Sequence, residues 1–314
     1  METRNLGNSG LQVSAVGLGC NNFGGRTDLE AARLVVDRAI ELGVTLFDTA
    51  DVYGQRGGSE AILGQLLGAR RQRIVLATKF SHAMDDAGWL RGASRRYIAS
   101  AVEASLRRLR TDWIDLYQLH DPDPATPIEE TLRALDDLTH QGKVRYIGSS
   151  NFAAWQAVEA DWTARQAGLS RFISCQNEYS LLVRDPEREL MPAMRARGLG
   201  LLPYFPLASG LLTGKYRRDQ PPPEGTRFAS SRGLKDRYWT DRNWTLVERF
   251  EKFARERGHT LLELAFSWLL SRPETASVIA GATRPEQVEG NVQAAAWKLT
   301  ADDLAAIDRL SAQP

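Results

Sequence analysis

Apolar positions along this chain follow two periods. Short apolar runs without polar alternation, such as residues 44–48, are typical of strands that are buried on both faces, as in a parallel sheet. Between these runs lie longer segments with apolar residues three and four positions apart. In residues 28–42 this spacing predicts a helix that ends before Gly43. The chain therefore reads as a series of strand and helix units.

The same pattern recurs eight times. The predicted strands span residues 13–19, 44–48, 74–79, 113–119, 144–149, 172–176, 199–204 and 277–280. The predicted helices span residues 28–42, 58–67, 94–109, 127–141, 152–167, 187–197, 243–256, 261–271 and 285–292, with a last helix capped near Thr300 and ending near Leu310. Residues 3–13 predict a β-hairpin around a Gly-rich turn. Eight strands followed by helices favour an α/β fold of the closed (β/α)8 TIM barrel type, over residues 1–314 as one domain, rather than an open doubly wound sheet.

One segment breaks the rhythm. Residues 205–240 contain Pro221, Pro222 and Pro223 with several glycines and basic residues. Long irregular segments of this kind are usually lids over a binding site or mobile linkers. We expect long loops at the C-terminal face of the barrel.

Composition narrows the classes of function. The 314 residues carry a formal net charge of +1, which does not favour nucleic acid as a partner. Cys20 and Cys175 are far apart and form no zinc or disulfide pattern, so we expect no metal and a reduced, cytoplasmic protein. The sequence has neither a signal-like start nor a long apolar run, so we do not expect membrane association. The oligomeric state stays open.

Polar residues of types that often take part in catalysis follow three successive strands. Asp48 and Tyr53 follow the second strand, Lys79 ends the third and His120 ends the fourth. Each alone has an ordinary explanation, as a loop cap, a packed ring or a solvated side chain. Because the C-terminal ends of barrel strands share one face, all four should converge there.

These four side chains together suit proton delivery to a carbonyl. A phenol titrates near 10 and becomes a useful acid when an ammonium such as Lys79 stabilises its anion. Asp48 would compensate the buried ammonium, and His120 could donate a hydrogen bond to the carbonyl oxygen. None of them can supply hydride, so a cofactor is needed. A glycosidase-type hydrolase is disfavoured because no second carboxylate accompanies Asp48.

The familiar nucleotide-binding motifs are absent. Residues 17–22 place Asn22 where the dinucleotide fingerprint needs a third small residue. Residues 210–216 are one residue short of a P-loop and carry Tyr216 after the lysine. A nucleotide cofactor would have to bind in another way.

The chain resembles the aldo-keto reductase family over nearly its whole length. The resemblance rests on the segments Phe-Asp-Thr-Ala, Val-Tyr-Gly, Ala-Thr-Lys and Leu-His-Asp-Pro, which contain Asp48, Tyr53, Lys79 and His120. It implies these four as the catalytic tetrad. It also implies that extended NADP(H) lies on the C-terminal face of the barrel without a Rossmann fold. Residues 43–48 resemble the bacterial and channel-subunit-like branches.

The resemblance also implies cofactor contacts. Ser150, Asn151 and Gln176 would bind the nicotinamide carboxamide, and Tyr204 would stack on the ring. Cys20 and Asn21, after Gly19, replace the Thr and Trp often found at the first strand exit of the family. The segment expected over the pyrophosphate contributes Phe205, Pro206, Leu207, Ala208, Gly210 and Lys215. The adenosine phosphate region would use Gly281, Thr283, Arg284, Gln287 and Asn291.

Cofactor preference depends on the charge beside the ribose. Thr283 and Arg284 precede a helix that begins near Pro285, and a hydroxyl, a guanidinium and a helix N-terminus favour the 2′-phosphate of NADP(H). Arg227 in the basic loop is the alternative source of this charge. The leading hypothesis is an NADP(H)-dependent oxidoreductase of small aldehydes, ketones or alcohols. The alternative is a cofactor-loaded redox sensor or partner subunit with slow turnover.

Overall fold

Eight parallel strands form the centre of the molecule. The computed structural model describes residues 1–312. Neighbouring strands pair in the order β10, β3, β4, β5, β6, β7, β8, β9. Their bounds are β3 (Val16–Gly19), β4 (Leu46–Asp48), β5 (Val75–Phe80), β6 (Ile114–Leu119), β7 (Val144–Ser150), β8 (Phe172–Gln176), β9 (Gly200–Leu201) and β10 (Val278–Gly281).

The strands close into a ring. Strand β10 pairs in parallel with β3, so that Val278 lies opposite Val16. On the other side, Leu201 of β9 donates to the Glu274 carbonyl at 2.6 Å and accepts from the Ala276 amide at 3.0 Å. The predicted (β/α)8 barrel is confirmed.

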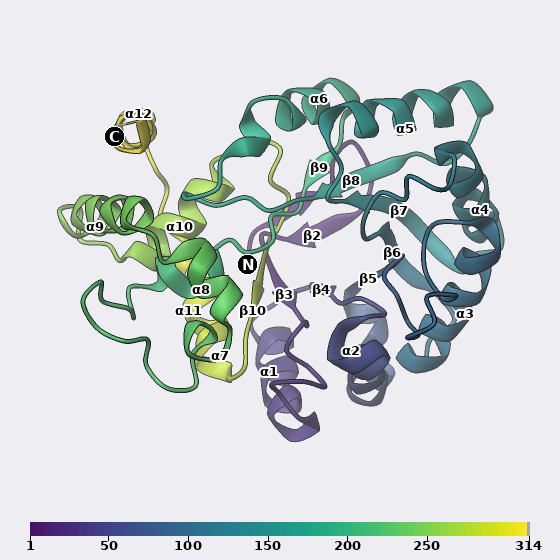
Figure 1. Cartoon of the computed structure of the whole chain (residues 1–314), viewed down its shortest axis with the longest axis horizontal. Coiled ribbons are helices and arrows are strands. Elements are labelled where there is room, and N and C mark those ends of the chain that lie inside the picture. Colours follow the sequence, from purple (N-terminus) through teal and green to yellow (C-terminus); the bar gives the residue numbers. More distant parts are fainter. Residues whose placement is uncertain (313–314) are drawn as a thin grey trace.

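Helices surround the strands (Figure 1). The helices between consecutive barrel strands are α1 (Leu29–Glu41), α2 (Tyr53–Leu67), α3 (Arg95–Leu109), α4 (Ile128–His140), α5 (Ala154–Ala167) and α6 (Leu190–Arg197). The C-terminal part adds α9 (Asp241–Arg255), α10 (Leu261–Leu270), α11 (Pro285–Ala294) and α12 (Ala301–Ala312). Helix α1 shows why the periodic pattern works: Asp28 caps its first turn through the Ala31 amide, and its buried residues recur on one face. Among residues 1–312, no helix combines the length and apolarity needed to span a bilayer.

Three predicted elements differ from the structure. The strand predicted over residues 199–204 is reduced to β9 (Gly200–Leu201). Residues 13–19 are not one strand, because the Ser14 hydroxyl donates to the Val16 carbonyl and accepts from the Thr45 amide, which separates β2 (Gln12–Ser14) from β3. The expected loop 205–240 contains the 3-10 helix η3 (Ala208–Thr213) and short helices α7 (Arg227–Ser230) and α8 (Arg232–Tyr238). Aromatic side chains order this segment, since the ring of Phe228 lies 5.0 Å from Tyr216 and 5.6 Å from Trp239.

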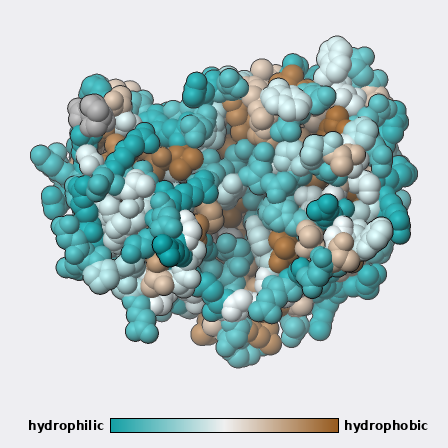
Figure 2. Space-filling model, viewed as in Figure 1, coloured by the Kyte–Doolittle hydropathy of each residue, from teal (hydrophilic) through white to brown (hydrophobic). Residues whose placement is uncertain are grey.

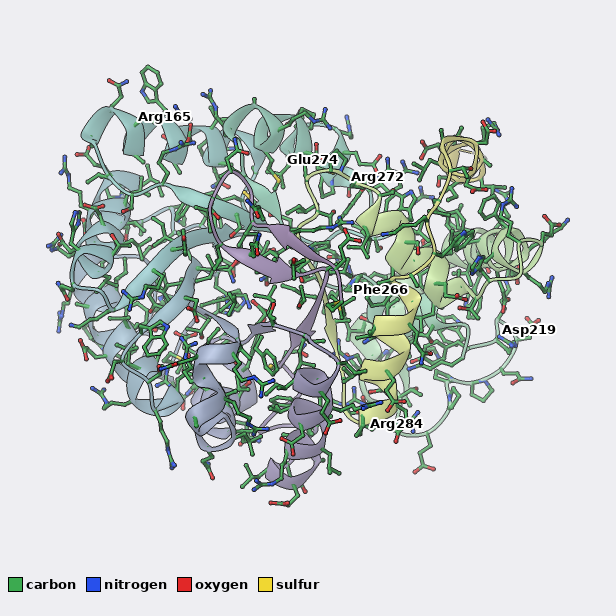
Figure 3. The ribbon with its side chains drawn as sticks, turned by 180° about the vertical axis from the view of Figure 1, so that it is seen from behind. Arg165, Asp219, Phe266, Arg272, Glu274 and Arg284 are labelled. Atoms are coloured by element: carbon green, nitrogen blue, oxygen red, sulfur yellow. The ribbon has the colours of Figure 1, made fainter. Side chains whose placement is uncertain are left out.

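An N-terminal hairpin covers the amino ends of the strands. Strand β1 (Thr3–Asn5) pairs antiparallel with β2, as predicted. At its turn Gly7 has φ +58°, and a Cβ there would lie 2.5 Å from the Gly198 carbonyl oxygen, so only glycine fits without a shift. Seen from behind, the hairpin crosses the barrel (Figure 3). The opposite, C-terminal face remains for a binding site.

Candidate functional site

A large cavity opens at the carboxyl ends of the strands. Its volume is about 820 Å³, and it extends from the ends of β3, β4, β7 and β8 to the start of α11. Figure 2 shows the hollow near the centre of the same face. Residues from the long segment 205–227 form much of the remaining wall.

The four predicted catalytic residues meet at one end of this cavity. Lys79 Nζ lies 2.7 Å from Asp48 Oδ2 and donates to the Thr49 carbonyl at 2.8 Å. It also lies 3.5 Å from the Tyr53 hydroxyl. The rings of Tyr53 and His120 meet edge to face, with their centroids 5.7 Å apart. The strand ends therefore bring together the side chains that the sequence separates.

Neighbouring amides support the buried Asp48 carboxylate. Gln176 donates to Asp48 Oδ1 at 2.8 Å, and Gln118 donates to the same oxygen at 3.3 Å. Asp48 is 3% exposed and Lys79 is fully buried. Because both carboxylate oxygens have donors, the buried ion pair is well compensated.

Burial and charge have opposite effects on the two proton-carrying groups. Burial alone would lower the pKa of Lys79, but Asp48 and Tyr53 outweigh it, and the net pKa is raised. Burial also raises the pKa of Tyr53, while Lys79 opposes this shift only in part. The sequence predicts the effect of the Lys79 ammonium on the Tyr53 phenol, but not the opposing effect of burial. At neutral pH Lys79 is therefore an ammonium and Tyr53 a neutral phenol.

His120 is held as a neutral imidazole. Burial, Lys79 and His82 lower its pKa to about 2. The His82 ring stacks on it with centroids 4.0 Å apart. The Nδ1 atom is buried and has no hydrogen-bond partner within the described residues. A neutral imidazole carries one N–H, which can serve as a hydrogen-bond donor.

Asn151 is already occupied by protein partners. Its amide nitrogen donates to the His120 carbonyl at 3.1 Å and to Asp121 at 2.7 Å. Its oxygen accepts from the Tyr204 hydroxyl at 2.8 Å. These bonds orient Tyr204 at the cavity wall, so Asn151 is placed to position that ring.

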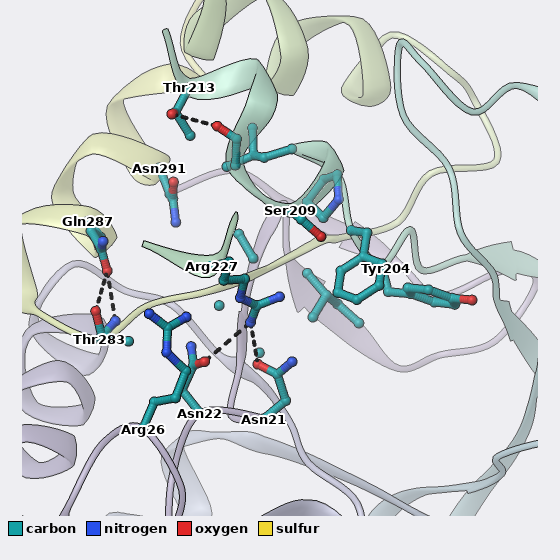
Figure 4. A pocket seen from close by; sticks show the side chains of 18 of the residues that line it. Asn21, Asn22, Arg26, Tyr204, Ser209, Thr213, Arg227, Thr283, Gln287 and Asn291 are labelled. Atoms are coloured by element: carbon teal, nitrogen blue, oxygen red, sulfur yellow. Dashed lines mark hydrogen bonds between the residues drawn. The ribbon is translucent and has the colours of Figure 1, made fainter. Parts of the chain in front are cut away.

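Four cationic side chains line the cavity beyond the tetrad. Lys215 has a lowered pKa because of its burial and because Arg26, Arg227 and Arg284 are near. Arg227 donates to Asn21 and Asn22 at 3.3 and 3.2 Å (Figure 4). This concentration of positive charge suits an anionic ligand.

The segment before α11 forms one end of this wall. The amide and the hydroxyl of Thr283 both donate to Gln287 Oε1, at 2.7 and 3.2 Å (Figure 4). Arg284 is largely exposed, and its Nε lies 4.0 Å from Glu286. Its guanidinium therefore remains available to a ligand at the N-terminus of α11.

Most residues expected to contact the cofactor line this cavity. They are Gly19, Asn21, Asp48, Ser150, Asn151, Gln176, Tyr204, Phe205, Pro206, Leu207, Gly210, Lys215, Arg227, Gly281, Thr283, Arg284, Gln287 and Asn291. Cys20 and Ala208 are not among its lining residues and are fully buried in the core. Cys20 follows Gly19, and neighbouring residues of an extended chain point in opposite directions.

Sequence reasoning missed several residues at the site. Gln118 lies on β6, and His120 directly follows this strand two positions later, so the strand period could have placed both on the same side. Arg26 lines the cavity and His82 stacks on His120. Neither lies in a periodic element, and no local pattern marked them.

Comparison with known proteins defines the class. The model of the aldo/keto reductase family matches residues 15–312, and the chain belongs to this family. YrpG of Bacillus subtilis, named an uncharacterized oxidoreductase, is 38% identical, over 94% of this chain and 91% of that protein. A probable voltage-gated potassium channel subunit beta of Arabidopsis thaliana has the same identity and coverage. An L-glyceraldehyde 3-phosphate reductase of Escherichia coli K12 is 34% identical, over 94% of this chain and 87% of that protein. Family and relatives support an oxidoreductase that acts on carbonyl compounds.

Proposed function

We propose that this protein transfers hydride between NADP(H) and small aldehydes or ketones, giving alcohols, and that the reaction is reversible. The observation that carries the proposal is the contact of the Tyr53 phenol with the buried Lys79 and Asp48 pair at one end of a cavity. The rest of that cavity carries four cations. The similar reductase named for glyceraldehyde 3-phosphate supports an aldehyde substrate.

The residues of the cavity fit an extended dinucleotide. Tyr204 offers an aromatic face, and Lys215 and Arg227 offer charge for a pyrophosphate. Arg284, at the start of α11, offers charge for a further phosphate. A bound nicotinamide would supply the hydride that no side chain can provide.

Side chains of the protein supply the proton to the substrate. Tyr53 holds its proton at neutral pH, since a phenol ordinarily titrates near 10 and burial raises the pKa of Tyr53 further. When a carbonyl oxygen takes that proton, the Lys79 ammonium stabilises the phenolate left behind. His120, being neutral, can donate a hydrogen bond to the carbonyl oxygen without competing as an acid.

The proposal is tested with Tyr53→Phe. We expect its kcat for NADPH oxidation with activated aldehydes to fall by about 10² to 10⁴, the usual contribution of a general acid. NADPH binding, followed by fluorescence, should stay close to that of the parent because only the hydroxyl is lost. Equal kcat values in both proteins would exclude Tyr53 as the proton donor.

Arg284→Ala tests the preference for NADP(H). A charge-assisted hydrogen bond to the 2′-phosphate contributes about 1.5 to 3 kcal/mol, so NADPH binding should weaken about tenfold or more. NADH binding should barely change, and the NADPH effect should shrink at high salt. Arg227→Ala is the matched comparison. Both cofactors contain the pyrophosphate, so the loss of a contact to it should weaken the binding of both. A similar loss of both cofactors in Arg284→Ala would assign the 2′-phosphate to another cation, with Arg227 the first alternative.

A second candidate function rests on the similar channel subunit. In that case the protein would be a cofactor-loaded redox sensor or partner subunit with slow turnover. Turnover below about one per minute with all carbonyls tested, far under typical kcat values, together with a stable partner protein, would favour it.

A further inference from the structure

A second cavity lies at the opposite end of the barrel. Its volume is about 190 Å³, and it lies at the amino ends of β8 and β9 beside the hairpin residue Asn8. Four arginines line it: Arg165 of α5, Arg171 before β8, and Arg195 and Arg197 of α6. Figure 3 labels Arg165 on this side of the molecule. No carboxylate is among the lining residues.

The arginines outnumber the carboxylates that they contact. Arg165 and Arg171 bind the two oxygens of Asp161 at 2.9 and 2.6 Å. Asp161 is 4% exposed, and Arg197 Nε lies 3.7 Å from it.

The fourth arginine has a different carboxylate. Arg195 Nε binds the buried Glu274 at 2.7 Å. Four guanidinium groups therefore face two carboxylates, which leaves two positive charges at one cavity.

Hydrogen-bond donors at this cavity are unused. Arg197 Nε is buried without a hydrogen-bond partner within residues 1–312, and at 3.7 Å Asp161 is too far to accept from it. The exposed side-chain amide of Asn8 has no hydrogen bond within the same residues. A buried donor without an acceptor is costly, and a ligand that accepts hydrogen bonds would remove this cost.

We propose that this cavity is a binding site for a phosphate-type oxyanion, either inorganic phosphate or the phosphate group of a phosphorylated metabolite. Guanidinium groups bind such oxyanions through paired N–H donors, and a doubly charged anion matches the excess of two positive charges. The volume far exceeds the roughly 10–15 Å³ that a single water needs. The site is distinct from the large cavity, because it lies at the opposite ends of the strands.

Equilibrium dialysis with radiolabelled inorganic phosphate at constant ionic strength tests the proposal. The parent should bind two phosphates, one in each cavity. Arg197→Gln should lose one of them, with its dissociation constant raised at least about tenfold. This variant should fold, because Asp161 keeps Arg165 and Arg171. Arg227→Gln should lose the other phosphate.

Further variants secure the assignment. Arg165→Gln, which leaves Arg171 on Asp161, should weaken the same phosphate as Arg197→Gln. Arg133→Gln is the matched control, since this half-exposed arginine pairs with Glu129 on the outside of α4 and should retain both phosphates. Displacement by phenyl phosphate at a lower concentration than inorganic phosphate would indicate a phosphate ester, and the reverse order would indicate free phosphate. Unchanged binding in Arg197→Gln and Arg165→Gln would overturn the proposal.

Discussion

Asp48 and Asp51 are two buried carboxylates near the end of the same strand, but their hydrogen-bond partners differ. Asp48 has donors on both oxygens, whereas Asp51 Oδ1 is buried without a partner within the described residues. Its other oxygen accepts from the Tyr97 hydroxyl, at 3.4 Å. Burial, followed by the charge of Glu60, raises the pKa of Asp51 from its ordinary 3.8 to about 7. This carboxyl therefore opposes folding when it ionises.

We predict that Asp51→Asn stabilises the protein in a pH-dependent way. The folded pKa is raised, so the favourable contribution of the protonated carboxyl is complete below pH 4 and is lost as the pH rises through about 7. The whole shift corresponds to roughly 4 kcal/mol, of which about 2 to 3 kcal/mol develop between pH 5 and pH 8. The asparagine variant should therefore gain more in the free energy of unfolding at pH 8 than at pH 5. Denaturant unfolding at both pH values measures this difference.

Asp219→Asn is the control for this prediction. Asp219 is exposed in the long segment and labelled at the edge of the molecule in Figure 3. Its replacement should change stability equally little at both pH values. If Asp51→Asn raised the free energy of unfolding equally at both pH values, ionisation of the Asp51 carboxyl would not be the cause of the destabilisation.

At the scale of elements, two arginines link the segment from η3 to α8 with the loop after β3. Arg26 donates to the Gly225 carbonyl at 2.8 Å, and Arg227 reaches Asn21 and Asn22. Between Lys215 and Arg227 the chain is mostly exposed. Local stability there depends on these arginines and on the aromatic cluster around Phe228.

We predict that Arg26→Ala loosens this segment without unfolding the barrel. Trypsin should cut after Arg217 and Arg218 several times faster, because the bond to the Gly225 carbonyl is lost. Mass spectrometry of the fragments over time measures the effect. Arg33→Ala on the outer face of α1, which removes only a surface pair with Glu30, should cut at the parental rate. Equal cleavage in all three proteins would show that the Arg26 bond does not hold the segment.

At the scale of the whole molecule, sequence periodicity predicts the repeated strand and helix units of the barrel. Asp48, Lys79 and His120 were identified because parallel strands end on one face, and the structure places them together. Contacts between irregular segments were not predicted. Arg26 and Gly225 lie far apart in sequence, and neither belongs to a periodic element that would predict their contact. Likewise the buried position of Cys20 depends on where β3 ends, and boundaries are less evident from sequence than the elements themselves.

The closure of the barrel also determines how the chain must be made. Strand β3 pairs with β10, and these two strands stand near opposite ends of the sequence. Synthesis proceeds from the N-terminus, so β3 to β9 leave the ribosome while β10 does not yet exist. Until then β3 and β9 are open edges of a curved sheet, with backbone groups free to pair with another chain. A nascent chain that stops before Val278 would keep both edges open, and it would be the form of this protein most prone to aggregate.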